Sequence, residues 1–120
     1  DRVRGEVRRR VWSLAGEHAP TAGISAASPL VIDVDATLVE VHSAKEGAAP
    51  TFKGGFGYHP LTAWFDHGPH GAGECAAIML RPGNAGANTA ADHIEVISRA
   101  LDQAGLGSRP GRKGRVQWSV

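Results

Sequence analysis

Cysteine is almost absent from this sequence, since Cys75 is the only one among 120 residues. A single thiol excludes an internal disulfide and cannot provide the paired cysteines of a structural zinc site. Long apolar runs are missing as well. No stretch approaches the roughly 18 residues that a membrane-spanning helix needs, and no apolar signal segment follows the Arg-rich start. We therefore expect a protein of a reducing cytoplasm without a membrane partner.

An excess of charge of one sign is also lacking, because 13 Lys and Arg residues face 12 Asp and Glu residues. Net charge alone therefore does not indicate a polyanionic partner. The basic residues are nevertheless concentrated at the two ends, at Arg2, Arg4, Arg8, Arg9, Arg10, Arg109, Arg112, Lys113 and Arg115. Both terminal segments could contact nucleic acid, although a charged run is more often simply a solvated surface.

The length allows one small domain, and 16 Gly with 7 Pro predict a loop-rich chain. We divide it into a basic helix and connector at 1–29, a domain at 30–105 and a Gly- and Arg-rich tail at 106–120. The tail composition predicts poor order.

The first segment has helical periodicity between residues 2 and 15. Its apolar residues recur at Val3, Val7, Val11 and Leu14, with arginines between them. This spacing predicts a short amphipathic helix whose apolar stripe packs inward and whose charged residues, Arg8 included, face solvent. Gly16 is expected to end the helix.

The most informative stretch is LVIDVDATLVEV at 30–41. Side chains alternate in a strand, so Asp33 and Asp35 should point to the same face, with Cα atoms about 7 Å apart. The nearly unbroken apolar run around them favours a strand that is covered on both faces, and hence a catalytic or metal-binding carboxylate pair. The alternative is the solvent face of an ordinary edge strand.

Two further strands are predicted at 58–66 and 74–81, separated by a turn. The stretch 42–57 has four glycines and Pro50, which predicts a loop without regular structure. The three strands should form an antiparallel meander.

A helix is predicted at about 88–104, where Ala91, Ile94, Ile97, Leu101 and Ala104 form one apolar stripe. Asn88, or a capping box from Thr89 to Asp92, should cap its start and contribute about 1 kcal/mol. The whole is a mixed α+β fold.

One pair of histidines, His67 and His70, lies in a Gly- and Pro-rich turn. This spacing could hold a surface metal ion, but exposed turn histidines without a metal are the alternative. Neither a dinucleotide-binding nor a phosphate-binding glycine loop occurs in the sequence.

The order of elements, a carboxylate-bearing strand, two antiparallel strands and a helix, is that of the opening half of the ribonuclease H-like fold. The stretches DVDATLVEVHSAKEGAAPTFKGGFGYHPL and LRPGNAGANTAADHI resemble the transposases of bacterial insertion sequences, in particular the group numbered thirteen-eighty. These enzymes move DNA with an Asp, Asp, Glu triad. The resemblance covers about residues 31–104.

The resemblance implies roles for individual residues. The family's first catalytic Asp stands in a D-x-T pattern, which is Asp35 to Thr37 here. It implies that Asp35 binds Mg²⁺ or Mn²⁺, with Asp33 as a supporting metal ligand, in two-metal phosphodiester chemistry. Lys53, His59 and Arg81 are candidates for DNA contact by position, and ordinary surface roles are the alternative.

The family's second Asp and its Glu have no counterpart in these 120 residues. The resemblance therefore implies the N-terminal part of a catalytic domain, a fragment that is catalytically incomplete. In the complete enzyme it implies transposon DNA as partner, possible homo-oligomers and association with the bacterial nucleoid. The alternative function is a non-enzymatic basic remnant that binds nucleic acid weakly and non-specifically.

Overall fold

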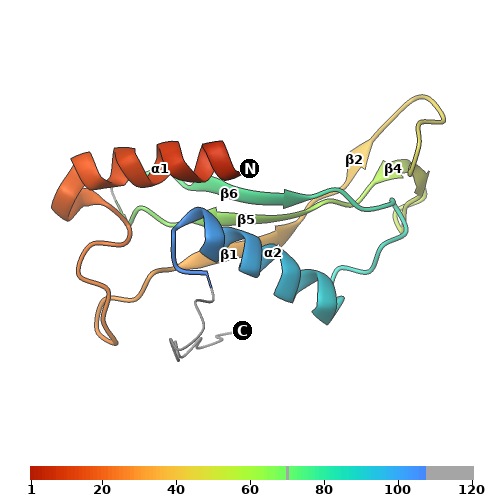
Figure 1. Cartoon of the computed structure of the whole chain (residues 1–120). Helices are drawn as coiled ribbons and strands as arrows, with labels where there is room; N and C mark the ends of the chain where they lie inside the picture. The colour runs from red at the N-terminus through yellow and green to blue at the C-terminus, as the bar shows by residue number, and fades with distance from the viewer. Residues whose placement is uncertain (70, 108–120) are drawn as a thin grey trace.

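The computed structural model describes residues 1–69 and 71–107 and shows a mixed α+β fold (Figure 1). The elements, in chain order, are α1 (Arg2–Ala15), the short 3-10 helix η1 (Gly16–His18), β1 (Ile32–Ala36), β2 (Val39–Glu40), β3 (Ala49–Pro50), β4 (Phe56–Tyr58), β5 (Leu61–Phe65), β6 (Glu74–Met79) and α2 (Ala90–Gln103). The predicted meander is confirmed as an antiparallel sheet of order β1-β5-β6.

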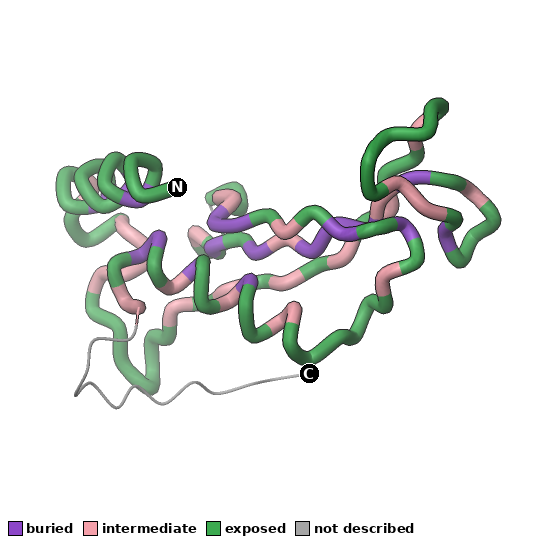
Figure 2. The backbone as a smooth tube through the Cα atoms, turned by 45° about the vertical axis from the view of Figure 1, so that its right-hand side comes forward, coloured by how far each residue is buried: buried purple, intermediate pink, exposed green. Residues whose placement is uncertain are grey.

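The core lies between this main sheet and α2. Leu61, Ala63 and Phe65 alternate along β5 toward the helix and are fully buried. Val96 and Ala100 of α2 are also fully buried and belong to the same cluster. Figure 2 shows the buried segments concentrated in the strands and the inner side of the helix. α2 therefore covers one face of the main sheet.

A second sheet, of order β2-β4-β3, corrects two predictions. The predicted strand at 30–41 is broken after Ala36, and the stretch 42–57 contains β3 and most of β4 instead of being entirely loop. The chain leaves the main sheet at Thr37, whose N–H donates to the carbonyl of Pro60, and it returns to that sheet as β5. Figure 1 shows the small sheet at the end of the main sheet that lies away from the 16–31 connector.

Glycine makes this small sheet possible. A Cβ atom at Gly57, in the central strand β4, would lie 2.0 Å from the carbonyl oxygen of Val39. No side chain fits at that distance, so only glycine permits the observed approach of the two strands.

The packing of α1 is the opposite of the predicted packing, although its bounds and its end at Gly16 are confirmed. Val3, Val7, Val11 and Leu14 are exposed, between 55% and 83%. The inward side of the helix carries Gly5, Arg8 and Trp12. Arg8, expected in solvent, is only 8% exposed. It can be buried because polar groups from distant parts of the chain surround its guanidinium, as described below.

The buried side of α2 matches the predicted stripe only in part. Ile97 packs against the core and Ala104, just after the helix, is buried, as predicted. Ile94 of the predicted stripe is instead 60% exposed, and the buried residues of the helix are Val96, Ala100 and Gln103. Thr89 occupies the N-cap position without a side-chain capping bond. The predicted capping box is therefore wrong, because the Asp92 carboxylate pairs with Arg81 instead.

The predicted tail at 106–120 falls outside the described residues except for 106 and 107. Within the described part of the chain, no helix is long and apolar enough to cross a membrane.

Candidate functional site

The two aspartates of β1 lie on one exposed face of the main sheet, as predicted. Asp33 and Asp35 are exposed, while the residues that alternate with them along β1, Ile32, Val34 and Ala36, are half-buried toward the core. β1 is an edge strand in the described residues. Because Asp33 and Asp35 are exposed, the prediction that both faces of this strand are covered is wrong. Both carboxylates lie in solvent, next to the edge of the sheet.

Side chains of β5 hold the backbone of β1 at this point. Asp35 is the cross-strand partner of Thr62, and Asp33 is that of Trp64. The Thr62 hydroxyl donates to the backbone carbonyl of Asp35 at 3.1 Å and accepts a hydrogen bond from the Trp64 indole at 2.9 Å. This chain of bonds fixes the strand that carries Asp35.

The donor chemistry of the pair suits a hard divalent cation, since carboxylate oxygens are the ligands that Mg²⁺ and Mn²⁺ prefer. Such ions require more oxygen ligands than two aspartates supply. Among residues 1–69 and 71–107, no group of three or more His, Cys, Asp or Glu side chains is placed to hold a metal. Asp33 and Asp35 therefore fit part of a metal site.

Of the three predicted DNA contacts, Lys53 is exposed. It lies in the turn between β3 and β4, at the tip of the small sheet.

The other two, His59 and Arg81, are in the interior, 3% and 4% exposed. The His59 ring bonds the carbonyl of Ala85 at 2.7 Å. Arg81 donates to the carbonyls of His59 and Gly86 and pairs with Asp92 at 3.0 Å. In this conformation both side chains brace the segment that leads into α2, and neither is available to a phosphate.

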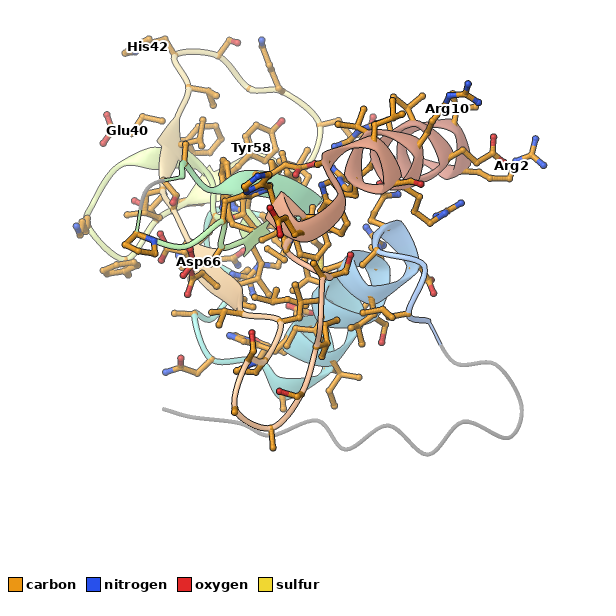
Figure 3. All side chains as sticks on the ribbon, turned by 90° about the vertical axis from the view of Figure 1, so that its left-hand side faces the viewer. Arg2, Arg10, Glu40, His42, Tyr58 and Asp66 are labelled. Atoms are coloured by element: carbon orange, nitrogen blue, oxygen red, sulfur yellow. The ribbon has the colours of Figure 1, made fainter. Side chains whose placement is uncertain are left out.

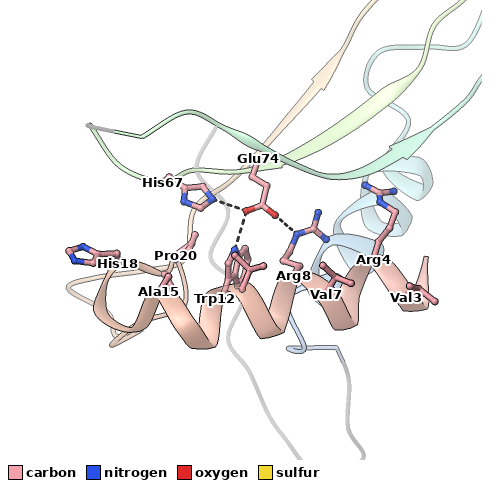
Figure 4. Close-up of a pocket in the computed structure, with 12 residues that line it drawn as sticks. Val3, Arg4, Val7, Arg8, Trp12, Ala15, His18, Pro20, His67 and Glu74 are labelled. Carbon is pink, nitrogen blue, oxygen red and sulfur yellow. Dashed lines mark hydrogen bonds and ion pairs between the residues drawn. The ribbon is translucent and has the colours of Figure 1, made fainter.

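Sequence reasoning missed a cluster around Glu74, at the start of β6 (Figure 4). Arg8 donates to Glu74 at 2.5 Å, Trp12 donates at 3.1 Å, and the His67 ring lies 2.8 Å away. Arg8 also bonds the side chain of Gln103 and the carbonyl of Cys75. These contacts join distant parts of the sequence and dock α1 against the main sheet and α2.

The charge on Glu74 is stabilised by this cluster. Partial burial raises the pKa of Glu74, but hydrogen bonds from Arg8, His67 and Trp12, together with the charge of Arg8, outweigh it. The pKa of Glu74 is therefore held below its usual value of 4.5.

A groove of about 490 Å³ runs along α1 beside this cluster. It is lined by Val3, Val7 and Val11 on the helix and by Ala19 and Pro20 of the connector. Figure 3 shows Arg2 and Arg10 extending outward from the same helix.

Of the predicted metal pair of His67 and His70, His70 lies outside the described residues. His67 itself is bonded to Glu74.

A family model described as transposase DDE domain group 1 matches residues 5–109. This range includes β1 with its aspartates, both sheets, α2 and all of α1 except its first three residues. No significant match was found among curated proteins or among solved structures.

Proposed function

Because the chain belongs to the transposase DDE domain group 1 family, we propose that it is a part of a DNA transposase in which Asp35 is the first carboxylate of the catalytic site. The observation that carries this proposal is the exposed pair of aspartates on one face of β1, within the matched range. DNA is the partner that the family implies in general. Within the family, the motifs around Asp35 and Arg81 favour the thirteen-eighty group. We further propose that residues 30–105 form part of a ribonuclease H-like domain, preceded by a basic helix and connector at 1–29 and followed by a tail at 106–120.

The proposed role of Asp35 is to supply oxygen ligands to Mg²⁺ or Mn²⁺, with Asp33 as its neighbour. When bound, such ions stabilise the charge that develops on the oxygens of a phosphodiester during its cleavage or joining. The chain's own residues hold the carboxylates in place, since Thr62 donates to the backbone carbonyl of Asp35. An edge strand with one open face also leaves room for DNA above Asp35.

The metal-binding role can be tested without measuring activity. Mn²⁺ broadens nearby NMR signals, and the Trp64 indole lies across the strand from Asp33. We expect weak Mn²⁺ binding that broadens the indole N–H signal of Trp64 before that of Trp12, and we expect Asp35→Asn to remove the difference. Preferential broadening of the Trp64 signal in the Asp35→Asn variant, as strong as in the unmodified chain, would refute the assignment.

We further propose that this 120-residue chain by itself neither cuts nor joins DNA. Two aspartates are fewer ligands than a two-metal site needs, and the described residues offer no third one nearby. Supercoiled plasmid incubated with the chain and Mn²⁺ should remain intact. Nicking by the unmodified chain, absent in an identically prepared Asp35→Asn variant, would show that another carboxylate or a second copy completes the site.

The second candidate function is a basic module that binds nucleic acid without sequence preference. It is favoured by the exposed arginines Arg2, Arg4, Arg9 and Arg10 along α1. Fluorescence anisotropy distinguishes the two functions. If only the basic module is present, binding falls steeply with salt and does not depend on Mn²⁺ or Asp35. In the cell, either function would place the chain in the bacterial cytoplasm, on the nucleoid.

A further inference from the structure

The tip of the small sheet exposes an aromatic ring. Phe52, in the turn between β3 and β4, is 73% exposed, whereas Trp64 on the open sheet face is 38% exposed. Single exposed apolar residues are common on protein surfaces and need no explanation by themselves. The surroundings of Phe52 are therefore what decides whether it has a role.

The turn that carries Phe52 is held by backbone and side-chain bonds. The N–H of Thr51 donates to the carbonyl of Gly55 at 2.9 Å, and the N–H of Gly54 donates to the carbonyl of Thr51 at 3.1 Å. Gly54 has φ +81°, which glycine tolerates best, and the buried Thr51 hydroxyl accepts the N–H of Gly55. Phe52 and Lys53 are the two central residues of this turn, so the fold presents them together.

A cation accompanies the ring. The Lys53 ammonium lies 5.8 Å from the centre of the Phe52 ring, and the buried His59 ring lies 5.9 Å from it on the side of the protein. An exposed ring next to a cation combines the two elements that bind nucleic acid without reading its sequence, stacking on a base and pairing with a phosphate.

The surrounding charge argues against a purely electrostatic contact. Lys45 and Lys53 on this part of the chain are offset by Glu40 and Glu46, all exposed. A broad basic patch is therefore absent from the described residues at this tip, and the ring must provide a large part of any affinity.

We propose that Phe52 stacks against an unpaired base of the DNA while Lys53 contacts an adjacent phosphate, which makes the turn at 51–55 a DNA-binding tip. This inference rests on the proposed function, since it takes DNA as the partner. The tip differs from the metal site at Asp35 in position, on the small sheet, and in chemistry.

The test measures binding of the full chain to a short fluorescent duplex with a single-stranded overhang, at several salt concentrations. Phe52→Ala should weaken binding about tenfold at constant salt dependence, because stacking contributes about 1–3 kcal/mol per base. Phe52→Tyr, which keeps the ring, should bind like the unmodified chain. Lys53→Ala should instead lower the salt dependence by about one phosphate contact. Val11→Ala, a change at another exposed apolar residue, is the matched control and should have no effect.

A second readout reports the stacking itself. A duplex that carries 2-aminopurine in its single-stranded overhang should change its fluorescence when the unmodified chain or Phe52→Tyr binds, and not when Phe52→Ala binds. If Phe52→Ala and the unmodified chain bind and perturb the probe equally, the stacking role is refuted and the proposed function stands. If the unmodified chain does not bind DNA even at low salt, both are refuted. Self-association that depends on Phe52, with DNA binding unchanged, would assign the ring to a second copy and also refute the inference.

Discussion

Replacing Glu74 by Gln tests whether the cluster around this residue docks α1. The substitution keeps the size and shape of the side chain and removes its charge. It leaves the Arg8 guanidinium, with its side chain 7% exposed, without an anion. The amide can also present only one oxygen to three neighbours, Arg8, Trp12 and His67, that are bonded to the two oxygens of the carboxylate.

The expected loss of stability follows from the burial of the two partners. Breaking a fully buried ion pair destabilises a protein by about 3–5 kcal/mol, because one charge is left uncompensated. The Glu74 side chain is 32% exposed, so water can partly replace it. We therefore expect Glu74→Gln to lower the free energy of unfolding by about 2–3 kcal/mol, which corresponds to about 10 °C in Tm for a chain of this size.

Urea unfolding at neutral pH, followed by tryptophan fluorescence, measures this loss. The matched control is Glu17→Gln, which removes a carboxylate that is 89% exposed and lies near the same helix. The control should change the free energy of unfolding by less than about 0.5 kcal/mol. If Glu74→Gln were as mild as Glu17→Gln, the cluster would not be what docks α1.

The pH dependence gives an independent check on the same cluster. The pKa of Glu74 is lower in the folded state than its usual value of 4.5, so its charge stabilises the fold fully above that value. The contribution is lost as the pH falls through the lowered folded-state pKa. The difference in unfolding free energy between the unmodified chain and Glu74→Gln should therefore be constant near neutral pH and shrink in acid. If this difference in unfolding free energy stayed constant at pH values well below the usual pKa of a glutamate, the charge of Glu74 would not be what stabilises the cluster.

Further substitutions test the packing. Gly57→Ala should unfold or displace the small sheet, because its Cβ would lie 2.0 Å from the carbonyl oxygen of Val39. Rapid amide hydrogen exchange confined to the small sheet would show this loss of structure, and protection equal to that of the unmodified chain would refute the close approach. Val7→Gln should change the free energy of unfolding by less than about 0.5 kcal/mol, since Val7 is 57% exposed, whereas Trp12→Ala should lower it by about 3 kcal/mol or more. If urea unfolding showed a large loss of unfolding free energy in Val7→Gln, the apolar stripe of α1 would be packed inward, as predicted from the sequence.

Local periodicity predicted the elements well. The side-chain alternation of a strand placed Asp33 and Asp35 on one face, and the structure has them there. The bounds of α1 and the end of α2 near Gly105 follow from helical spacing and from glycines that end helices.

What periodicity could not predict is which face of a helix is buried when distant polar groups decide it. The sequence of α1 shows an apolar stripe, but it does not show that Glu74 and Gln103 will enclose Arg8. The same reason explains why the predicted capping box of α2 does not form, because Asp92 in the first turn of the helix pairs with Arg81. For the aspartates, the apolar run suggested two covered faces because it was taken as one strand, whereas the chain changes sheets after Ala36.

Because the chain changes sheets after Ala36, it leaves the main sheet and returns to it at neighbouring positions. The N–H of Thr37 bonds the carbonyl of Pro60, and Ala36 already faces Leu61 in the main sheet. A tight two-residue turn would be enough to join β1 to β5 as an ordinary hairpin. The longer connection adds only a modest closure entropy, because that cost grows with the logarithm of loop length. Its last part, however, is bound to the rest of the molecule, since the His59 ring bonds the carbonyl of Ala85 and the carbonyl of His59 accepts a hydrogen bond from Arg81. The fold thus connects the strand that carries the aspartates, through this excursion, with the segment that leads into α2.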